Sequence, residues 1–378
     1  MTRRQERRSS YGPLFSQEKD SALIQASLER WLDSARRDPK KLEQLRKALG
    51  APTRLSRVLG KALAAAATKT SPQIFRSLKA RGPAMLREQR ATFAGFERRL
   101  YRTWKRPLDL LEMFIVVCSE SGESLSAQWP WKESPEQNLV FDVIRRLQAR
   151  ACQAASEILT LLKAGYAPAA HARWRTLHEM AATAFLIARH GKDVAERFLA
   201  HEHVEAWKAA EQYQRCCSRL GERRFSRKEM ATFRRNYGAA LKRYGPDFKN
   251  PYGWAAAALG NKSPKFADIE KAAGLDHMRP YYRMASYPVH ATAKTIRFSL
   301  ALMPRQDILF TGPSGFGLAD PGHSTAISLG QITTATITLL PSCDTVSVGR
   351  VLLMFTDEIG KEFIKVHRRV EARAKRRP

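Results

Sequence analysis

The sequence predicts an all-α protein, in which a basic N-terminal helical region is followed by an antiparallel helical bundle. Apolar residues recur at spacings of three and four along most of the chain, as on one face of a helix. Glycine and proline fall between these stretches and mark their ends. Hydrophobic residues make up 44% and charged residues 27% of the chain, which is typical of a folded globular protein.

A chain of 378 residues suits two helical domains that each bury a core. We expect a flexible basic arm over residues 1–20, an N-terminal helical region over 21–130, a C-terminal helical bundle over 131–373 and a basic tail over 374–378. The domain boundary is placed in a polar segment that contains two tryptophans and two prolines. The arm carries four arginines in its first eight positions, which predicts non-specific electrostatic contacts.

Short basic helices are expected from residue 21 to about 106. The dipeptides Ser71-Pro72 and Gly82-Pro83 should separate them, because proline removes a backbone donor from a helix interior. Arg106-Pro107 then introduces an apolar helix that is expected to end near Gly122.

The bundle region contains two long helical patterns, at about 139–162 and about 169–190, and Pro168 fits the first turn of the second. Further helices are expected at 194–219 and 227–244, followed by a stop at Gly245-Pro246. Residues 278–302 are predicted to form one helix kinked at Pro288. Two final helices are expected at 324–340 and 345–373, although the β-branched residues of the first leave a strand as an alternative.

The charge balance is the most unusual global property of the chain. Its 65 Lys and Arg residues against 36 Asp and Glu residues give a net charge of +29. Phosphate binding releases counterions, so nucleic acid is the first expected partner and an anionic membrane surface the second. The alternative is a basic surface that has no polyanionic partner.

The sequence contains no motif for a metal or a cofactor. Five cysteines form no pair or Cys/His cluster with zinc spacing, and they are interpreted as reduced thiols. The glycine-rich stretch 310–322 lacks the lysine of a phosphate-binding loop. No transmembrane segment is apparent, and no apolar stretch follows the N-terminal arginines, so a cytoplasmic location is expected.

The second half of the chain resembles a bacterial family known as domain of unknown function 5677. The resemblance rests on the residues from Arg175 to Glu179, on Ala195 to Leu199, on Trp254 and on the segment from Tyr282 to His290. It covers roughly residues 169–297, with a weaker extension to 340. What it implies is a helical domain, without an established activity.

One polar cluster lies in the predicted helix around Pro288. On a continuous helix, Tyr282, Ser286 and His290 would share one face at i, i+4 and i+8, with Arg283 beside them. An imidazole next to a guanidinium suits phosphodiester chemistry, because the first moves a proton and the second neutralises developing negative charge. The Arg283–His290 spacing also fits the Arg-x4–6-His signature of small helical ribonuclease domains, but two other Arg–His pairs in the chain fit it equally well.

A second polar stripe is predicted on the helix at 169–190, where His171, Arg175 and His178 follow at i, i+4 and i+7 with Glu179 alongside. If the two stripes face each other, they form either an enclosed polar site or a buried structural network. We expect Arg175 and Glu179 to lie close to His290, and His290 to be buried.

Three functions remain open from the sequence. The first is nucleic-acid binding, directed to RNA or non-specific. The second is a metal-independent ribonuclease of a bacterial defence or toxin type, centred on Arg283 and His290 with Tyr282 and Ser286. The third is a protein-interaction scaffold.

Overall fold

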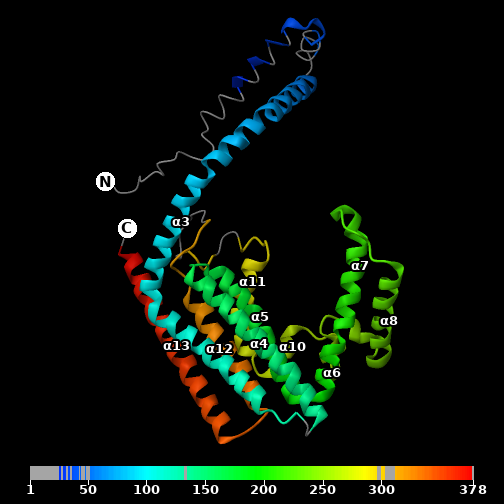
Figure 1. Ribbon diagram of the computed structural model, residues 1–378, viewed down its shortest axis with the longest axis vertical. Coiled ribbons are helices and arrows are strands. Elements are labelled where there is room, and N and C mark those ends of the chain that lie inside the picture. Colours follow the sequence, from blue (N-terminus) through cyan, green and yellow to red (C-terminus); the bar gives the residue numbers. More distant parts are fainter. Residues whose placement is uncertain are drawn as a thin grey trace. The chain divides into compact units, whose positions relative to one another are not determined.

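The computed structural model confirms the all-α fold class. It describes residues 52–131, 134–295, 299–302 and 311–376, and short stretches between 25 and 47. Within these ranges the regular structure is helical, with no strand (Figure 1). The predicted basic arm over 1–20 lies outside the described residues.

The chain divides into two compact units, Met1–Phe96 and Glu97–Pro378. This division lies within a helix, α3, whereas the sequence placed its domain boundary near residue 130. The segment around residue 130 instead separates α3 from the next helix of the second unit.

Helix α3 spans Pro52–Gln128, so the expectation of several short helices in this region was wrong. Pro72, Pro83 and Pro107 all lie in its interior, and the helix also passes through Gly122. Proline removes one ladder bond from a helix but does not have to end it. The helical residues on both sides of each proline outweigh the cost of the lost hydrogen bond. The position of a proline in the sequence does not by itself show this balance.

The second unit is built around four packed helices together with the C-terminal part of α3. These are α4 (Pro135–Lys163), α5 (Ala167–His190), α12 (Ala319–Ile337) and α13 (Cys343–Lys375). Helix α5 packs against α4 and α12, and α12 also packs against α13. The predicted helices at these positions are therefore confirmed, and the β-branched segment is helical rather than a strand.

Local sequence explains where these helices begin and end. The Ser134 side chain accepts a hydrogen bond from the N–H of Gln137 and caps α4. Gly165, with a φ of 81°, supplies the left-handed backbone of the tight connection to α5. In α12, the hydroxyls of Thr325 and Thr336 donate to carbonyls four residues earlier, so their buried polar groups are satisfied within the helix.

Aromatic side chains fill the core of the second unit. Trp104 of α3 and Phe363 of α13 are both fully buried, with ring centroids 6.0 Å apart. The Trp104 indole also donates to the Gly315 carbonyl at 3.2 Å. Gly322 lies directly against the Phe363 ring, and a side-chain carbon there would approach the ring to 2.3 Å. The close packing of α12 against α13 thus depends on a glycine at position 322, opposite the large ring of Phe363.

A helical hairpin follows α5. The expected single helix at 194–219 is in fact two, α6 (Lys192–Ala200) and α7 (Glu202–Leu220), with His201 between them. The His201 ring is buried and donates from Nε2 to the Asn250 carbonyl at 2.9 Å. Helix α8 spans Arg227–Tyr244 as predicted and packs against α7.

Short elements connect the hairpin to α12. They are η1 (Pro246–Lys249), η2 (Gly253–Ala255), α9 (Ala256–Leu259), α10 (Phe266–Ala273), η3 (Asp276–Met278), α11 (Arg279–Ser286) and η4 (Tyr287–Val289). Helix α8 ends at Gly245, which has a φ of 91°. The predicted stop at Gly245-Pro246 is therefore confirmed.

The prediction of one kinked helix over 278–302 was wrong. Helix α11 ends at Ser286, and His290 has extended backbone angles of −115° and 133°. Pro288 lacks the N–H that would continue the ladder. The carbonyls of Tyr287 and His290 accept the N–H groups of His290 and Thr292, and the Thr295 hydroxyl lies 2.9 and 2.6 Å from the same two oxygens, so the turn after the helix is closed by local hydrogen bonds.

At the C-terminus, α13 runs to Lys375. It therefore includes the first two residues of the predicted basic tail over 374–378. Residues 377–378 lie outside the described part of the chain.

Candidate nucleic-acid interface

The polar stripe of α5 contacts α11 through the phenol of Tyr282. Arg175 donates from a terminal guanidinium nitrogen to the Tyr282 hydroxyl at 2.7 Å, and that hydroxyl in turn donates to the Glu179 carboxylate. The Arg175 guanidinium also lies over the Tyr282 ring, 4.5 Å from its centroid. The predicted contact between the two stripes thus occurs at Tyr282.

A second acid–base group lies beside this contact. His178 and Glu270 are both fully buried, and the His178 Nε2 is 2.8 Å from a Glu270 carboxylate oxygen. Arg279 forms an ion pair with the same carboxylate and lies over the Tyr282 ring, 5.2 Å from its centroid. We call Arg175, His178, Glu179, Glu270, Arg279 and Tyr282 the buried network.

Sequence reasoning missed Glu270 and Arg279. A signal for Glu270 was present, because it lies at i+4 from Phe266 and next to Ile269, so a charged residue occupies the apolar face of α10. A charge in that position needs a buried partner. No comparable pattern identifies Arg279, which lies at the first turn of α11.

The network is closed to solvent at its centre, and this shifts its ionisation. Burial, assisted by the hydrogen bond to Glu179, raises the pKa of the Tyr282 phenol, so it stays protonated and can bridge Arg175 and Glu179. The arrangement joins α5 to α10 and α11 through buried charge-assisted hydrogen bonds.

His171 lies on the same helix but does not belong to this network. Its ring is fully buried and stacks on Trp174 at 5.3 Å. Neither ring nitrogen has a hydrogen-bond partner among the described residues. Burial lowers the pKa of His171 to about 4, so the ring is neutral near pH 7.

His290 lies elsewhere, and it is exposed rather than buried as expected. With Arg283, Ser286, Tyr287 and Thr292 it lines an open pocket of about 540 Å³. Ser286 donates its hydroxyl to the Tyr282 carbonyl at 2.9 Å. Within the described residues, no hydrogen bond or ion pair joins His290 to Arg175 or Glu179.

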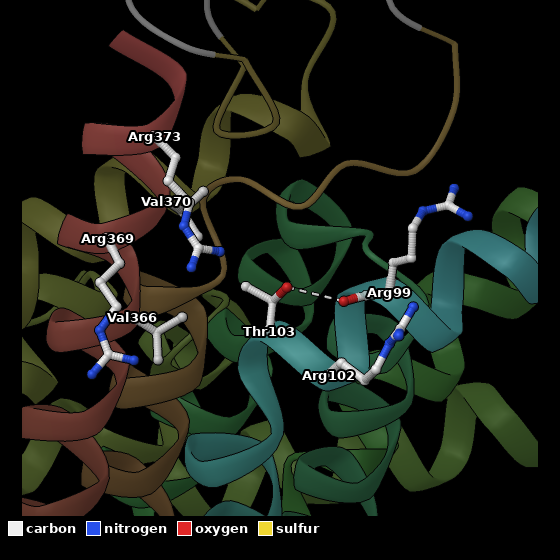
Figure 2. Close-up of a pocket in the computed structure, with 7 residues that line it drawn as sticks. All are labelled: Arg99, Arg102, Thr103, Val366, Arg369, Val370 and Arg373. Carbon is white, nitrogen blue, oxygen red and sulfur yellow. Dashed lines mark hydrogen bonds between the residues drawn. The ribbon is translucent and has the colours of Figure 1, made fainter. Parts of the chain in front are cut away.

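A basic groove runs between α3 and α13 within the second unit (Figure 2). One hollow of about 470 Å³ is lined by Arg99, Arg102, Thr103, Val366, Arg369, Val370 and Arg373. Figure 2 shows Arg99 and Arg102 on α3 and Arg369 and Arg373 on α13, with Thr103 between them. An adjoining hollow of about 610 Å³ extends the groove past Lys105, Arg106 and Lys365.

Helical spacing places these cations on the same side. Arg99, Arg102 and Arg106 follow at i, i+3 and i+7 on α3, and Arg369 and Arg373 at i and i+4 on α13. The two helices are fixed beside the groove by the buried contact of Trp104 with Phe363 and by the ion pair of Arg106 with Glu358. The rows of charge therefore lie on a packed scaffold.

The four arginines of the smaller hollow have no ion pair with any described carboxylate. Their neighbours differ, because Lys105 pairs with Asp109 and Lys365 with Glu362. The smaller hollow therefore carries positive charge that no described carboxylate neutralises. Sequence reasoning noted basic helices here, but could not bring α3 and α13 together across more than 250 intervening residues.

The described residues include no group of three or more His, Cys, Asp or Glu side chains that could hold a metal ion. Among them, no helix is both long and apolar enough to cross a membrane.

Comparisons with known proteins identify one similarity. Neither the curated proteins nor the solved structures include a match to the chain. Residues 141–304 match the model of a family of unknown function (DUF5677). This range contains the buried network and the His290 pocket, whereas the basic groove lies outside it on both sides. Over residues 141–304 the chain is thus similar to the family of unknown function (DUF5677), which confirms the resemblance predicted from its residues.

Proposed function

We propose that this protein binds nucleic acid through sequence-independent contacts to phosphates, and that the basic groove between α3 and α13 makes these contacts. The observation that carries the proposal is the hollow lined by Arg99, Arg102, Arg369 and Arg373, none of which is ion-paired with a described carboxylate. A net charge of +29 supports the same partner class.

Arginine suits this role because its planar guanidinium can donate two parallel hydrogen bonds to one phosphate. Phosphates are the repeating anion of every nucleic acid, so contacts of this kind carry no sequence information. Val366 and Val370 line the groove between the cations and offer no group that could read a base edge. Binding is therefore expected to be general rather than base-specific.

The test replaces all four arginines by glutamine, R99Q/R102Q/R369Q/R373Q, and measures binding to a labelled single-stranded RNA at low salt. A matched control removes four exposed cations elsewhere in the second unit, as R150Q/R234Q/K242Q/K271Q. We expect the groove variant to lose at least about tenfold in affinity and the control less than about threefold. Equal losses in both variants, with unchanged circular dichroism, would show that total charge rather than the groove binds RNA.

A second candidate function is metal-independent RNA cleavage at the His290 pocket. The observation that favours it is that Arg283, Ser286 and His290 line one open pocket, where a phosphodiester could reach both the imidazole and the guanidinium. The imidazole would accept the proton of the 2′-hydroxyl as its oxygen bonds to phosphorus, and the guanidinium would neutralise the phosphorane. The phosphorus–O5′ bond would then break to leave a 2′,3′-cyclic phosphate, and O5′ would take up a proton from the imidazolium or from water.

Incubation of labelled RNA with the protein in the presence of a chelator separates the candidates. Cleavage that is lost in H290A and R283A, at unchanged melting temperature, supports the enzyme. Binding without cleavage selects the groove function alone. Neither binding nor cleavage leaves the protein-interaction scaffold.

A further inference from the structure

The tip of the α7–α8 hairpin is a second surface with an unusual charge density. Within residues 215–228 it presents six exposed cations, namely Arg215, Arg219, Arg223, Arg224, Arg227 and Lys228. None of them forms an ion pair with a carboxylate in the described part of the chain. Two acids lie at or beside the tip: Glu222 is exposed in the turn itself, and Glu229 accepts the N–H of Ser226 in the cap of α8.

Side chains of α7 and α8 contact the loop that carries these cations. Tyr213 donates its hydroxyl to the Arg223 carbonyl at 2.9 Å. The Gln214 amide bonds to both backbone groups of Phe225, donating to its carbonyl at 3.1 Å and accepting its N–H at 3.0 Å. Phe225 packs between Tyr213 and Phe233, at 4.8 and 5.5 Å between ring centroids. The three rings therefore pack on one another and are partly buried.

The exposed apolar side chain at this tip is Leu220, the last residue of α7, which is 64% exposed. Gly221 follows it in the left-handed conformation, with a φ of 73°, and turns the chain toward α8. Leu220 thus lies at the turn of a hairpin, directly after Arg219 and three residues before Arg223. Figure 1 shows this hairpin extending beyond α6, with α7 and α8 side by side.

We propose that the tip of the α7–α8 hairpin docks on an anionic lipid bilayer. An exposed leucine at a tip with six cations and one acid, Glu222, matches the two layers of such a surface, because the apolar side chain can enter the acyl boundary while the arginines contact lipid phosphates. Nucleic acid matches the tip less well. Single-stranded bases stack on exposed aromatic rings, whereas the rings of this loop already pack on one another, and phosphates make no apolar contact with Leu220.

The free energies expected for cations and for a leucine at a membrane surface are large enough for the tip to bind anionic vesicles measurably. Each cation near an anionic membrane surface contributes about fivefold to the partition coefficient. Burial of an exposed leucine side chain contributes about tenfold more. Several cations acting with Leu220 therefore give strong binding to anionic vesicles, whereas Leu220 alone leaves neutral vesicles essentially unbound.

The test is co-sedimentation of the full chain with vesicles of phosphatidylcholine, with and without phosphatidylglycerol. The variants are L220S and R219Q/R223Q/R224Q/R227Q. The controls are the groove variant R99Q/R102Q/R369Q/R373Q and the cation control R150Q/R234Q/K242Q/K271Q. Labelled RNA binding is measured in parallel for every protein, and thermal melts confirm that each is folded.

We expect binding only to the anionic vesicles, reduced about tenfold in L220S and more than about thirtyfold in the tip-cation variant, with smaller changes in the controls. L220S binding as well as the unmodified chain would overturn the proposal, as would equal losses in the tip and control variants. A tip-cation variant that loses RNA but not vesicle binding would assign the tip to nucleic acid instead. The groove function has its own variant, so either proposal can fail while the other stands.

Discussion

The buried ring of His171 makes stability depend on acid in a defined pH range. Burial lowers its pKa from 6.5 to about 4, so the unfolded chain takes up the proton first as the pH falls. Protonation of His171 does not change the free energy of unfolding at pH 7. Below about pH 6.5 its buried ring lowers that free energy, and the loss reaches about 3 kcal/mol below pH 4. We expect H171L to reduce the loss of stability between pH 6.5 and 4, measured by urea unfolding. H203Q, at an exposed position of α7, should leave that loss unchanged, and identical pH profiles for H171L and the unmodified chain would contradict this account.

The Tyr282 hydroxyl holds together the part of the buried network that joins α5 to α11. Y282F keeps the ring and its contact with Arg175 but removes the group that bonds Arg175 and Glu179. We expect a loss of about 1 kcal/mol of unfolding free energy, because both charged partners lose a hydrogen bond that is part-buried and therefore partly screened by water. The adjacent Tyr281 is 42% exposed, so Y281F is the matched control and should change stability by less than about 0.5 kcal/mol.

The sequence predicted contacts of the buried network only where both residues lie on regular helices, because helical spacing then fixes which side chains share a face. Arg175 and Glu179 share a face of a regular helix, and their meeting with Tyr282 followed from two such faces. His290 did not, because Pro288 ends the ladder and turns the chain out of the helix. Glu270 and Arg279 come from short elements whose position depends on tertiary packing rather than on periodicity.

At the scale of elements, the contact of α12 with α13 requires a glycine. An alanine carbon at Gly322 would lie 2.3 Å from the Phe363 ring, which is fully buried and cannot move away. We expect G322A to cost at least about 1–3 kcal/mol through overpacking. A side-chain carbon added at Gly238 in α8 would have no neighbouring atom within 4 Å. G238A should therefore stabilise the protein by up to about 1 kcal/mol. If both variants shifted the melting temperature alike, the close approach of α12 and α13 would be refuted.

Helix α3 retains interior prolines that weaken it. Pro83 is exposed and lies within a continuous helix, so P83A restores one backbone hydrogen bond and removes a steric clash. Proline in a helix interior costs about 3 kcal/mol relative to alanine. We expect P83A to raise helicity and resistance to proteolysis around residue 83, whereas A80S at a nearby exposed position should not. Lower helicity in P83A would mean that the helix is not continuous there.

The elements that the sequence predicted well are helices whose interior contains no proline between clear start and stop signals. Helix α8 matches its prediction residue for residue, since Ser226 and Glu229 cap its start and Gly245 ends it. Helix α3 was divided wrongly because proline and glycine were interpreted as ends. Their local cost is small beside the many hydrogen bonds of a helix of 77 residues.

At the scale of the whole molecule, the central claim is that a fixed groove, and not diffuse charge, binds nucleic acid. Packing around Trp104 and Phe363 brings together arginines from two helices that are far apart in the sequence. Composition predicts nucleic acid as the partner class, because a charge of +29 is a property of the chain. The groove proposed as the binding site depends on which helices become neighbours, and composition does not contain that information.

The salt dependence of RNA binding tests this claim most directly. The logarithm of the affinity should fall linearly with the logarithm of the salt concentration, with a slope of about −0.7 for each phosphate neutralised on a single strand. R99Q/R102Q/R369Q/R373Q should therefore make the slope shallower by up to about 3, while R150Q/R234Q/K242Q/K271Q leaves it nearly unchanged. Equal slopes for the groove variant and the unmodified chain would contradict the account.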